Sequence, residues 1–171
     1  MQMATKSQLI NTMSLLQNLL ATGTDVNDIP SPGGSYIALN IRGTRATVAI
    51  QSPIDQKKLL YTGILGKDLT TEDGYQAAKI CALNVLKQVN RYVNEDDLVG
   101  LNHVDIMYQC TQEWDEGPLV ANGASDIFLQ VLGEKGVHTR SIAGVFRLPR
   151  QFCVAIVASF TVKEGAVLQQ L

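Results

Sequence analysis

Few residues of this chain have side chains suited to catalysis, and those few stand apart in the sequence. The two histidines, His103 and His138, have no partner at metal-ligand spacing, and no zinc, phosphate-loop or nucleophile-elbow motif occurs. His103 and Asp105 alternate along an expected strand and so share one face, where a solvated polar pair is the ordinary outcome. The sequence therefore predicts no metal site.

Arg140 is the charged residue whose position is most informative. It stands at the start of an otherwise apolar run, 139–145, directly after a loop that contains His138. Its guanidinium could simply reach solvent. Alternatively it is fixed in a cleft, where its planar fork can bind a carboxylate through two parallel hydrogen bonds. The second arrangement would select small anionic molecules without any basic surface.

Acidic and thiol side chains offer less. The cluster 113–116 (Glu-Trp-Asp-Glu) could supply paired carboxylates, but negative charge just before a helix is also what the helix dipole favours. The cysteines Cys81, Cys110 and Cys153 are widely spaced within apolar patterns. This predicts buried free thiols and a reducing, cytoplasmic environment.

Composition narrows the class of protein. The chain has 171 residues, of which 46% are hydrophobic and only 18% charged, a length that suits one domain. Its 14 Lys and Arg against 16 Asp and Glu leave no basic excess, which argues against nucleic-acid binding. No apolar run is long enough for a membrane span. The low charge favours a surface that is partly covered by other subunits.

Hydrophobic periodicity predicts an α+β order of helix, three strands, helix, strand, helix and two strands. Both long helices have one apolar stripe, so we expect them to pack on one face of a mixed sheet, with the other face still in need of a cover. The expected elements are a helix at 5–21, a hairpin of strands 36–41 and 46–50, a short strand at 59–63, a helix from Thr70 or Thr71 to 93, a strand at 101–111, a helix at 117–132, and strands at 139–147 and 151–162.

Three segments resemble the YjgF/RidA family, in its longer branch labelled YjgF-like endoribonuclease or L-PSP. They are 72–84, 120–126, and Thr139-Arg140-Ser141 followed by Arg147-Leu148-Pro149 and an alternating strand. The resemblance covers residues 29–162. It predicts a single YjgF/RidA-like domain at 29–171, preceded by an N-terminal helical extension at 1–28.

The resemblance implies a chorismate-mutase-like fold and a homotrimer whose sheets face inward, with the helices outside. Ligand clefts would lie between adjacent subunits. Well-studied branches of the family hydrolyse reactive enamine and imine intermediates to 2-oxo acids and ammonia, and they need no metal or organic cofactor. The expected partner is therefore a small carboxylate-bearing metabolite, with no nucleic acid and no membrane.

The family pattern also assigns substrate-binding residues. Arg140 matches the arginine that grips the substrate carboxylate, and Asn122 matches an asparagine of the cleft. Tyr36 matches a cleft-lining aromatic residue of the first strand, and Gln51 belongs to the segment that follows the second strand. These four residues are the predicted binding site.

Two departures from the pattern affect catalysis. The glutamate that positions water in deaminating branches falls on Ala155, which can neither accept a proton nor orient water, and Ala49-Ile50 replaces Ser-Gly beside the cleft. A carboxylate of the acidic loop, Glu113 or Glu116, could substitute, so no catalytic residue is assigned. Three functions remain: an enamine or imine hydrolase, a non-catalytic binding or regulatory trimer, and a ribonuclease, which the net charge of −2 disfavours.

Overall fold

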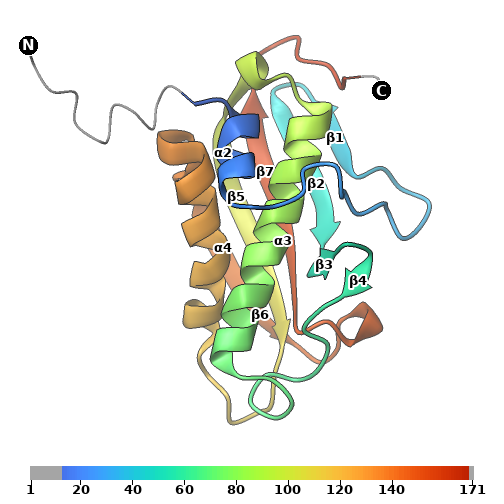
Figure 1. Cartoon of the computed structure of the whole chain (residues 1–171), viewed down its shortest axis with the longest axis vertical. Helices are drawn as coiled ribbons and strands as arrows, with labels where there is room; N and C mark the ends of the chain where they lie inside the picture. Colours follow the sequence, from blue (N-terminus) through green and yellow to red (C-terminus); the bar gives the residue numbers. More distant parts are fainter. Residues whose placement is uncertain (1–12, 170–171) are drawn as a thin grey trace, which may run out of the picture.

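The computed structural model describes residues 13–169, which form a mixed five-stranded sheet with helices on one face (Figure 1). The strand order is β1-β2-β7-β5-β6, and only the β5–β6 pair is parallel. The elements are α2 (Leu15–Ala21), β1 (Leu39–Arg42), β2 (Arg45–Gln51), β3 (Ile54–Asp55), β4 (Lys58–Leu59), α3 (Thr71–Tyr92), β5 (Leu98–Gln109), α4 (Gly117–Leu132), β6 (Thr139–Val145) and β7 (Val154–Val162). Parallel neighbours need a crossover, and α4 supplies it between β5 and β6.

The core lies between the sheet and the two long helices. Alternate residues of β7, from Val154 to Val162, point into it, and the apolar stripes of α3 and α4 cover them. Phe128 of α4 and Phe160 of β7 are fully buried there. The predicted α+β fold with both long helices on one face is therefore confirmed.

Glycines let α3 and α4 approach closely. A Cβ on Gly74 would lie 2.6 Å from Val120 Cγ2, and a Cβ on Gly123 would overlap the carbonyl oxygen of Tyr75. Because the second obstacle is backbone, no rotamer change could relieve it. The distance between the two helices is therefore set by the absence of a side chain at Gly123.

A capping box begins α3 at Thr70. The Thr70 hydroxyl accepts from the Asp73 N–H, and Asp73 Oδ2 accepts from the Thr70 N–H at 2.8 Å and from its hydroxyl at 2.7 Å. Those bonds, the backbone one first, hold the pKa of the Asp73 carboxyl below its ordinary value. Stability from this lowered pKa is present above about pH 4 and is lost as the pH falls through the folded-state pKa.

Replacing Asp73 by asparagine is expected to remove that pH-dependent contribution. Because Asp73 is near the surface, we expect a loss of about 0.5 kcal/mol at neutral pH that shrinks toward about pH 3. Urea unfolding at the two pH values measures it. Glu72→Gln removes a neighbouring charge from the same turn and serves as the control. A stability difference between wild type and Asp73→Asn that stays constant with pH would contradict the assignment.

Several predicted boundaries were wrong. The helix predicted at 5–21 does not run through Ser14, which is extended and caps α2, while residues 5–12 lie outside the described part of the chain. The first strand begins at Leu39, because Tyr36 bonds back to Gly34 instead of to a neighbouring strand. The predicted strand at 59–63 is reduced to β4, which pairs only with β3. The strand predicted at 139–147 ends at Val145, and the strand predicted at 151–162 begins at Val154, because a 3-10 turn at 149–151 lies between them.

The described residues leave most of the second face of the sheet uncovered, and the turn at 148–152 covers only its end at Ala155. Its side chains are mixed in polarity, because the large apolar residues of β7 point to the helices. His103 bonds there to Thr139 at 2.7 Å, Ser141 at 3.0 Å and Asp105 at 3.2 Å, the satisfied polar pair that the alternation predicted. Apolar residues around Met107 line a shallow hollow beside it.

Candidate functional site

Arg140 is held in a fixed position beside α4. Its Nη1 donates to Asn122 Oδ1 at 2.9 Å and to Ser125 Oγ at 3.0 Å, and its Nη2 makes a longer bond of 3.4 Å to the Pro118 carbonyl. The side chain is half-buried at the β6 edge of the sheet. Its Nε–H donates to no described residue, so the Nε–Nη2 side of the fork can still receive a carboxylate.

His138 supports this arrangement from behind. Its Nδ1 lies 2.6 Å from the Gly136 carbonyl oxygen and its Nε2 lies 3.1 Å from Ser125 Oγ. A carbonyl can only accept, so Nδ1 donates to Gly136, and in the tautomer with its proton on Nδ1 alone Nε2 accepts from the Ser125 hydroxyl. The Ser125 oxygen is thereby oriented to accept from Arg140.

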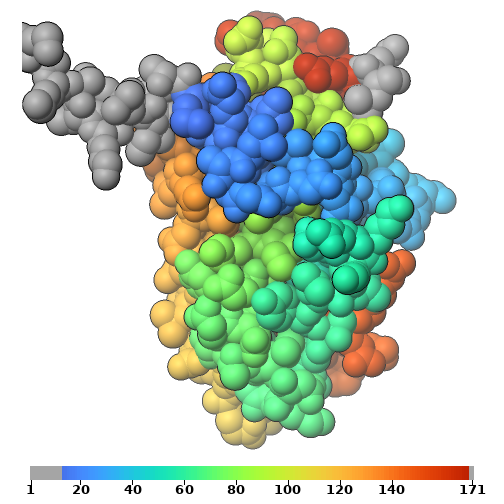
Figure 2. All heavy atoms as spheres, viewed as in Figure 1, coloured from blue at the N-terminus to red at the C-terminus, as the bar shows by residue number. Residues whose placement is uncertain are grey.

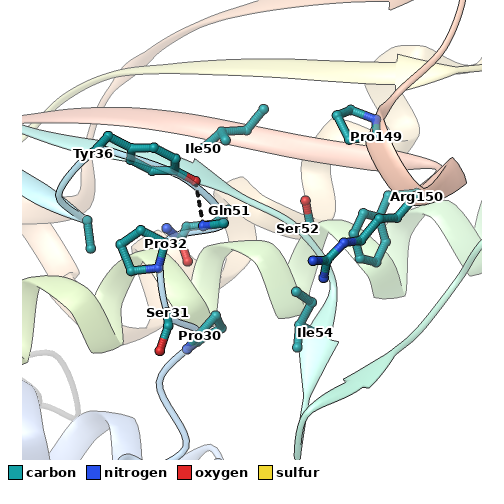
Figure 3. Close-up of a pocket in the computed structure, with 13 residues that line it drawn as sticks. Pro30, Ser31, Pro32, Tyr36, Ile50, Gln51, Ser52, Ile54, Pro149 and Arg150 are labelled. Atoms are coloured by element: carbon teal, nitrogen blue, oxygen red, sulfur yellow. Dashed lines mark hydrogen bonds between the residues drawn. The ribbon is translucent and has the colours of Figure 1, made fainter.

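A pocket of about 500 Å³ contains the other two predicted residues, Tyr36 and Gln51 (Figure 3). The Tyr36 hydroxyl accepts from the Gly33 N–H at 3.1 Å, and Gln51 Nε2 donates to the Ala49 carbonyl at 3.0 Å. The lining residues are Pro30, Ser31, Pro32, Gly33, Tyr36, Ala38, Ile50, Gln51, Ser52, Ile54, Pro149, Arg150 and Phe152. None of them is acidic, and Ile50 contributes an apolar side chain to the lining.

Buried polar side chains of α3 hold two walls of this pocket. Asn84 Nδ2 donates to the carbonyls of Ser52 and Ile54, at 3.1 and 2.8 Å. Lys87 Nζ donates to the Asp28 carbonyl at 3.1 Å, and Gln88 Nε2 donates to the Pro30 carbonyl at 2.8 Å. Figure 2 shows the blue connector held in this way, lying across the upper part of the helix face.

Lys87 is almost completely buried, with 1% of its surface exposed. Burial lowers the pKa of its ammonium group, and the nearby carboxylates of Asp28, Asp55 and Asp25 partly oppose that shift. Burying a long charged side chain is costly unless its donors are used. We therefore assign Lys87 the structural role of anchoring the connector that leads to Pro30.

A buried glutamine fixes the third wall. Gln109, 4% exposed at the end of β5, accepts from the Leu148 N–H at 2.9 Å and donates to the carbonyls of Gly63 at 2.8 Å and Gln151 at 3.1 Å. The turn that it holds places Arg150 and Gln151 in the left-handed backbone region, at φ 55° and 59°. Non-glycine residues adopt this region rarely, so the surrounding contacts determine the turn.

Neither Glu113 nor Glu116, the carboxylates that could replace the family's glutamate, lines the pocket. Ala155 is buried with Leu148 and Phe152 in a small apolar cluster behind the pocket wall. Glu116 accepts a hydrogen bond from the Thr71 hydroxyl, which in turn accepts from Trp114 Nε1 at 3.0 Å. Within the described chain, nothing acidic therefore faces the pocket.

The predicted binding residues form two groups at opposite edges of one sheet. Arg140 and Asn122 lie together at the β6 edge, whereas Tyr36 and Gln51 lie at the β1–β2 edge. With neighbouring strands about 4.8 Å apart, the two edges are separated by roughly 19 Å. Within one chain, the two members of each group lie close together, but the two groups lie far from each other.

Sequence reasoning missed the side chains that build the pocket. Asn84, Lys87 and Gln88 share one face of a helix predicted only from its apolar stripe, and three polar residues at that spacing beside the stripe are the signal available. Gln109 ends a strand, and nothing local marks it as buried. Arg150 follows Leu148-Pro149 in a turn that was predicted without a role.

The cysteines are free, but only two of them are buried. Cys81 and Cys153 lie in the core, whereas Cys110 is half-exposed, which corrects the prediction for that residue. Burial raises the pKa of the Cys81 thiol and raises that of Cys153 to about 12. These two thiols are therefore protonated and unreactive at neutral pH.

Residues 13–169 contain neither a metal-binding cluster nor a membrane-spanning helix. No group of three or more His, Cys, Asp or Glu side chains in this range is arranged to hold a metal ion. No helix in the same range is both long and apolar enough to cross a bilayer.

Comparison with known proteins gives consistent matches. The family model described as YjgF/chorismate mutase-like, putative endoribonuclease, matches residues 16–161. Protein TCP17 of Trypanosoma cruzi is 33% identical over 134 residues, which cover 77% of this chain and 84% of that protein. The crystal structure of a putative endoribonuclease from Shewanella oneidensis MR-1 aligns with a TM-score of 0.81 and 26% identity, over 87% of this chain and 99% of that one.

A more distant structure, Escherichia coli TdcF with bound serine, shares the fold. It aligns with a TM-score of 0.53 and 17% identity, over 82% of this chain and 98% of that one.

Proposed function

The chain belongs to the YjgF/chorismate mutase-like family, and from that membership we propose that it binds a small carboxylate-bearing metabolite in clefts between the subunits of a homotrimer. The observation that carries this proposal is Arg140, which Asn122 and Ser125 hold while one side of its guanidinium stays open. A fixed guanidinium with two free donors matches the bidentate geometry of a carboxylate.

The trimer is supported by what each chain leaves incomplete. Arg140 and the pocket with Tyr36 lie at opposite edges of the sheet, so only neighbouring copies can bring them together. The exposed part of the second sheet face, with its apolar hollow around Met107, is available to a partner. Phe146, at the end of β6, is fully exposed, and Ile37 near the other edge is 58% exposed. Both side chains are available for contact with a neighbouring copy.

The proposed cleft would bind its ligand by complementary roles. Arg140 of one subunit would hold the carboxylate, with Asn122 fixing the guanidinium. The neighbouring subunit would supply the pocket, where Tyr36 and Gln51 offer polar atoms and Ile50 offers an apolar contact. Binding of this kind needs no metal and no cofactor. The serine bound by Escherichia coli TdcF is, like the proposed ligand, a small molecule with a carboxylate.

Hydrolysis of enamines or imines to 2-oxo acids is the second candidate. The match of Arg140 and Asn122 to the family pattern favours it. Ala155 and the absence of acidic lining residues favour binding alone, because no carboxylate is placed to activate water. We therefore expect binding without strong turnover. Ribonuclease activity is expected to be absent, since the net charge is −2.

Two organisational features belong to the same proposal. We treat residues 1–28 as an extension to a domain at 29–171, although Leu15 and Leu19 of the extension are buried in the shared core. The free cysteines support a reducing compartment, and we place the protein in the cytoplasm.

Arg140→Ala is expected to weaken binding of 2-oxobutyrate about 10- to 100-fold, because a hydrogen bond to a charged group contributes about 1.5–3 kcal/mol. Isothermal titration measures the dissociation constant, and sedimentation velocity on the same samples measures the oligomeric state. Arg147→Ala changes an exposed arginine outside the pocket lining and is the matched control.

Two results would contradict the proposal. One is a wild-type protein that sediments as a monomer. The other is equal binding of 2-oxobutyrate by wild type and by a trimeric Arg140→Ala variant. Adding the protein to an amino-acid oxidase reaction separates the candidates, because an accelerated release of the 2-oxo acid would favour hydrolysis over binding alone.

A further inference from the structure

Arg150 is a second arginine at the proposed ligand site, and it belongs to the pocket itself. Figure 3 shows its guanidinium extending toward Ser52 and Ile54, at the end of the lining opposite Tyr36. Within residues 13–169 its guanidinium donates no hydrogen bond and forms no ion pair. Its charge is therefore available to a ligand in the pocket.

The backbone of Arg150 is held in an unfavourable conformation. At φ 55° and ψ 18° it lies in the left-handed region, and the next residue, Gln151, has φ 59°. Gln109 clamps both sides of this turn, at the Leu148 N–H and the Gln151 carbonyl. Strain of this kind persists only where surrounding contacts impose it, and it clusters at ligand clamps. Arg150 is thus presented to the pocket without further ordering of the loop.

The charge of the pocket is unbalanced. None of the lining residues is acidic, so Arg150 gives this pocket a net positive charge within a chain of net charge −2. In the assembled cleft, the adjacent subunit's Arg140 would add a second cation. Two separated guanidinium groups match two separated anionic groups on one ligand better than they match one.

We propose that Arg150 binds a second carboxylate, so that the preferred ligand is a short 2-oxo dicarboxylic acid. The inference rests on the proposed function, in which Arg140 holds the first carboxylate. A carboxylate is favoured over a phosphate, because one guanidinium balances a single negative charge and a phosphate would bring nearly two. Arg150 therefore determines specificity, whereas Arg140 determines binding as such.

A matched ligand pair tests the proposal. 2-Oxoglutarate and 2-oxopentanoate have the same chain length and differ in the terminal carboxylate alone. By isothermal titration, wild type is expected to bind 2-oxoglutarate about tenfold more tightly, the lower range for a charged hydrogen bond because Arg150 is exposed. Arg150→Gln should bring that ratio to about one and leave the 2-oxopentanoate affinity unchanged. Arg140→Ala should weaken both ligands, and Arg147→Gln should change neither.

A second variant separates function from folding. Arg150→Gly relieves the left-handed backbone strain, so it should lose the preference for 2-oxoglutarate while unfolding at the same temperature as wild type or higher. Equal binding of both ligands by wild type, or a preference that survives in Arg150→Gln, would overturn the role of Arg150 alone. Failure of both ligands to bind would overturn the proposed function itself. Tighter binding of phosphoenolpyruvate than of 2-oxoglutarate would overturn the choice of carboxylate.

Discussion

Replacing Gly123 by alanine is expected to destabilise the protein by about 3 kcal/mol, at the upper end of the range for overpacked cores. The added Cβ would overlap the Tyr75 carbonyl oxygen of α3, and Gly123 itself is buried in α4. An alanine normally improves a helix, so this loss would arise from forced separation of the helices alone. The midpoint of urea unfolding, read by circular dichroism, measures it.

Gly144→Ala is the control for this substitution. It adds the same methyl group in β6, where the nearest atom, Tyr108 Cε2, would be 3.5 Å away, an ordinary contact. We expect a change within about 0.5 kcal/mol of wild type, as for most substitutions without a specific mechanism. Equal unfolding midpoints for Gly123→Ala and wild type would show that the helices can separate without cost.

Replacing Gln109 by leucine is expected to cost about 3 kcal/mol, since a buried group left without its hydrogen bond costs about 1–3 kcal/mol. The substitution removes the acceptor of the Leu148 N–H and the donor to the carbonyls of Gly63 and Gln151. The melting temperature should fall by about 6–12 °C for a chain of this size. Gln130→Leu, on the exposed side of α4, is the control and should change it little.

Gln109→Glu gives the same site a pH dependence. The carboxylate would face two carbonyl oxygens, so its folded-state pKa should be raised above the unfolded value of about 4.3. A raised carboxyl pKa means that the folded state binds more protons, and stability then falls as the pH rises through that window. A variant as stable at neutral pH as at about pH 4 would contradict the assigned hydrogen bonds.

Local patterns predicted the helices well, because their causes are local. The bounds of α4 agree with the predicted 117–132, and Thr70, one of the two predicted starts, caps α3. Ser14 shows the limit of periodicity. The apolar spacing continues through it, yet its side chain caps α2 together with Gln17.

The pocket could not be predicted in the same way, because its bonds are distant in sequence. Lys87 donates to the Asp28 carbonyl, 59 residues away in the sequence. Gln109 accepts from the Leu148 N–H, which is 39 residues away. Because every residue has a backbone carbonyl, the accepting position has no characteristic side chain that a sequence pattern could reveal. Tyr36 was identified by resemblance alone, and its place outside the strand depends on its own bonds to Gly33 and Gly34.

The two halves of the proposed cleft lie at opposite edges of one sheet, and this has a genetic consequence. In the proposed trimer, a chain that has lost Arg140 would still present an intact pocket to one neighbour, and a chain with a damaged pocket would still present Arg140 to the other. Two alleles that are each inactive alone would therefore complement one another when co-expressed. Every trimer that contains both kinds of chain would have one interface at which an intact Arg140 from one kind meets an intact pocket from the other.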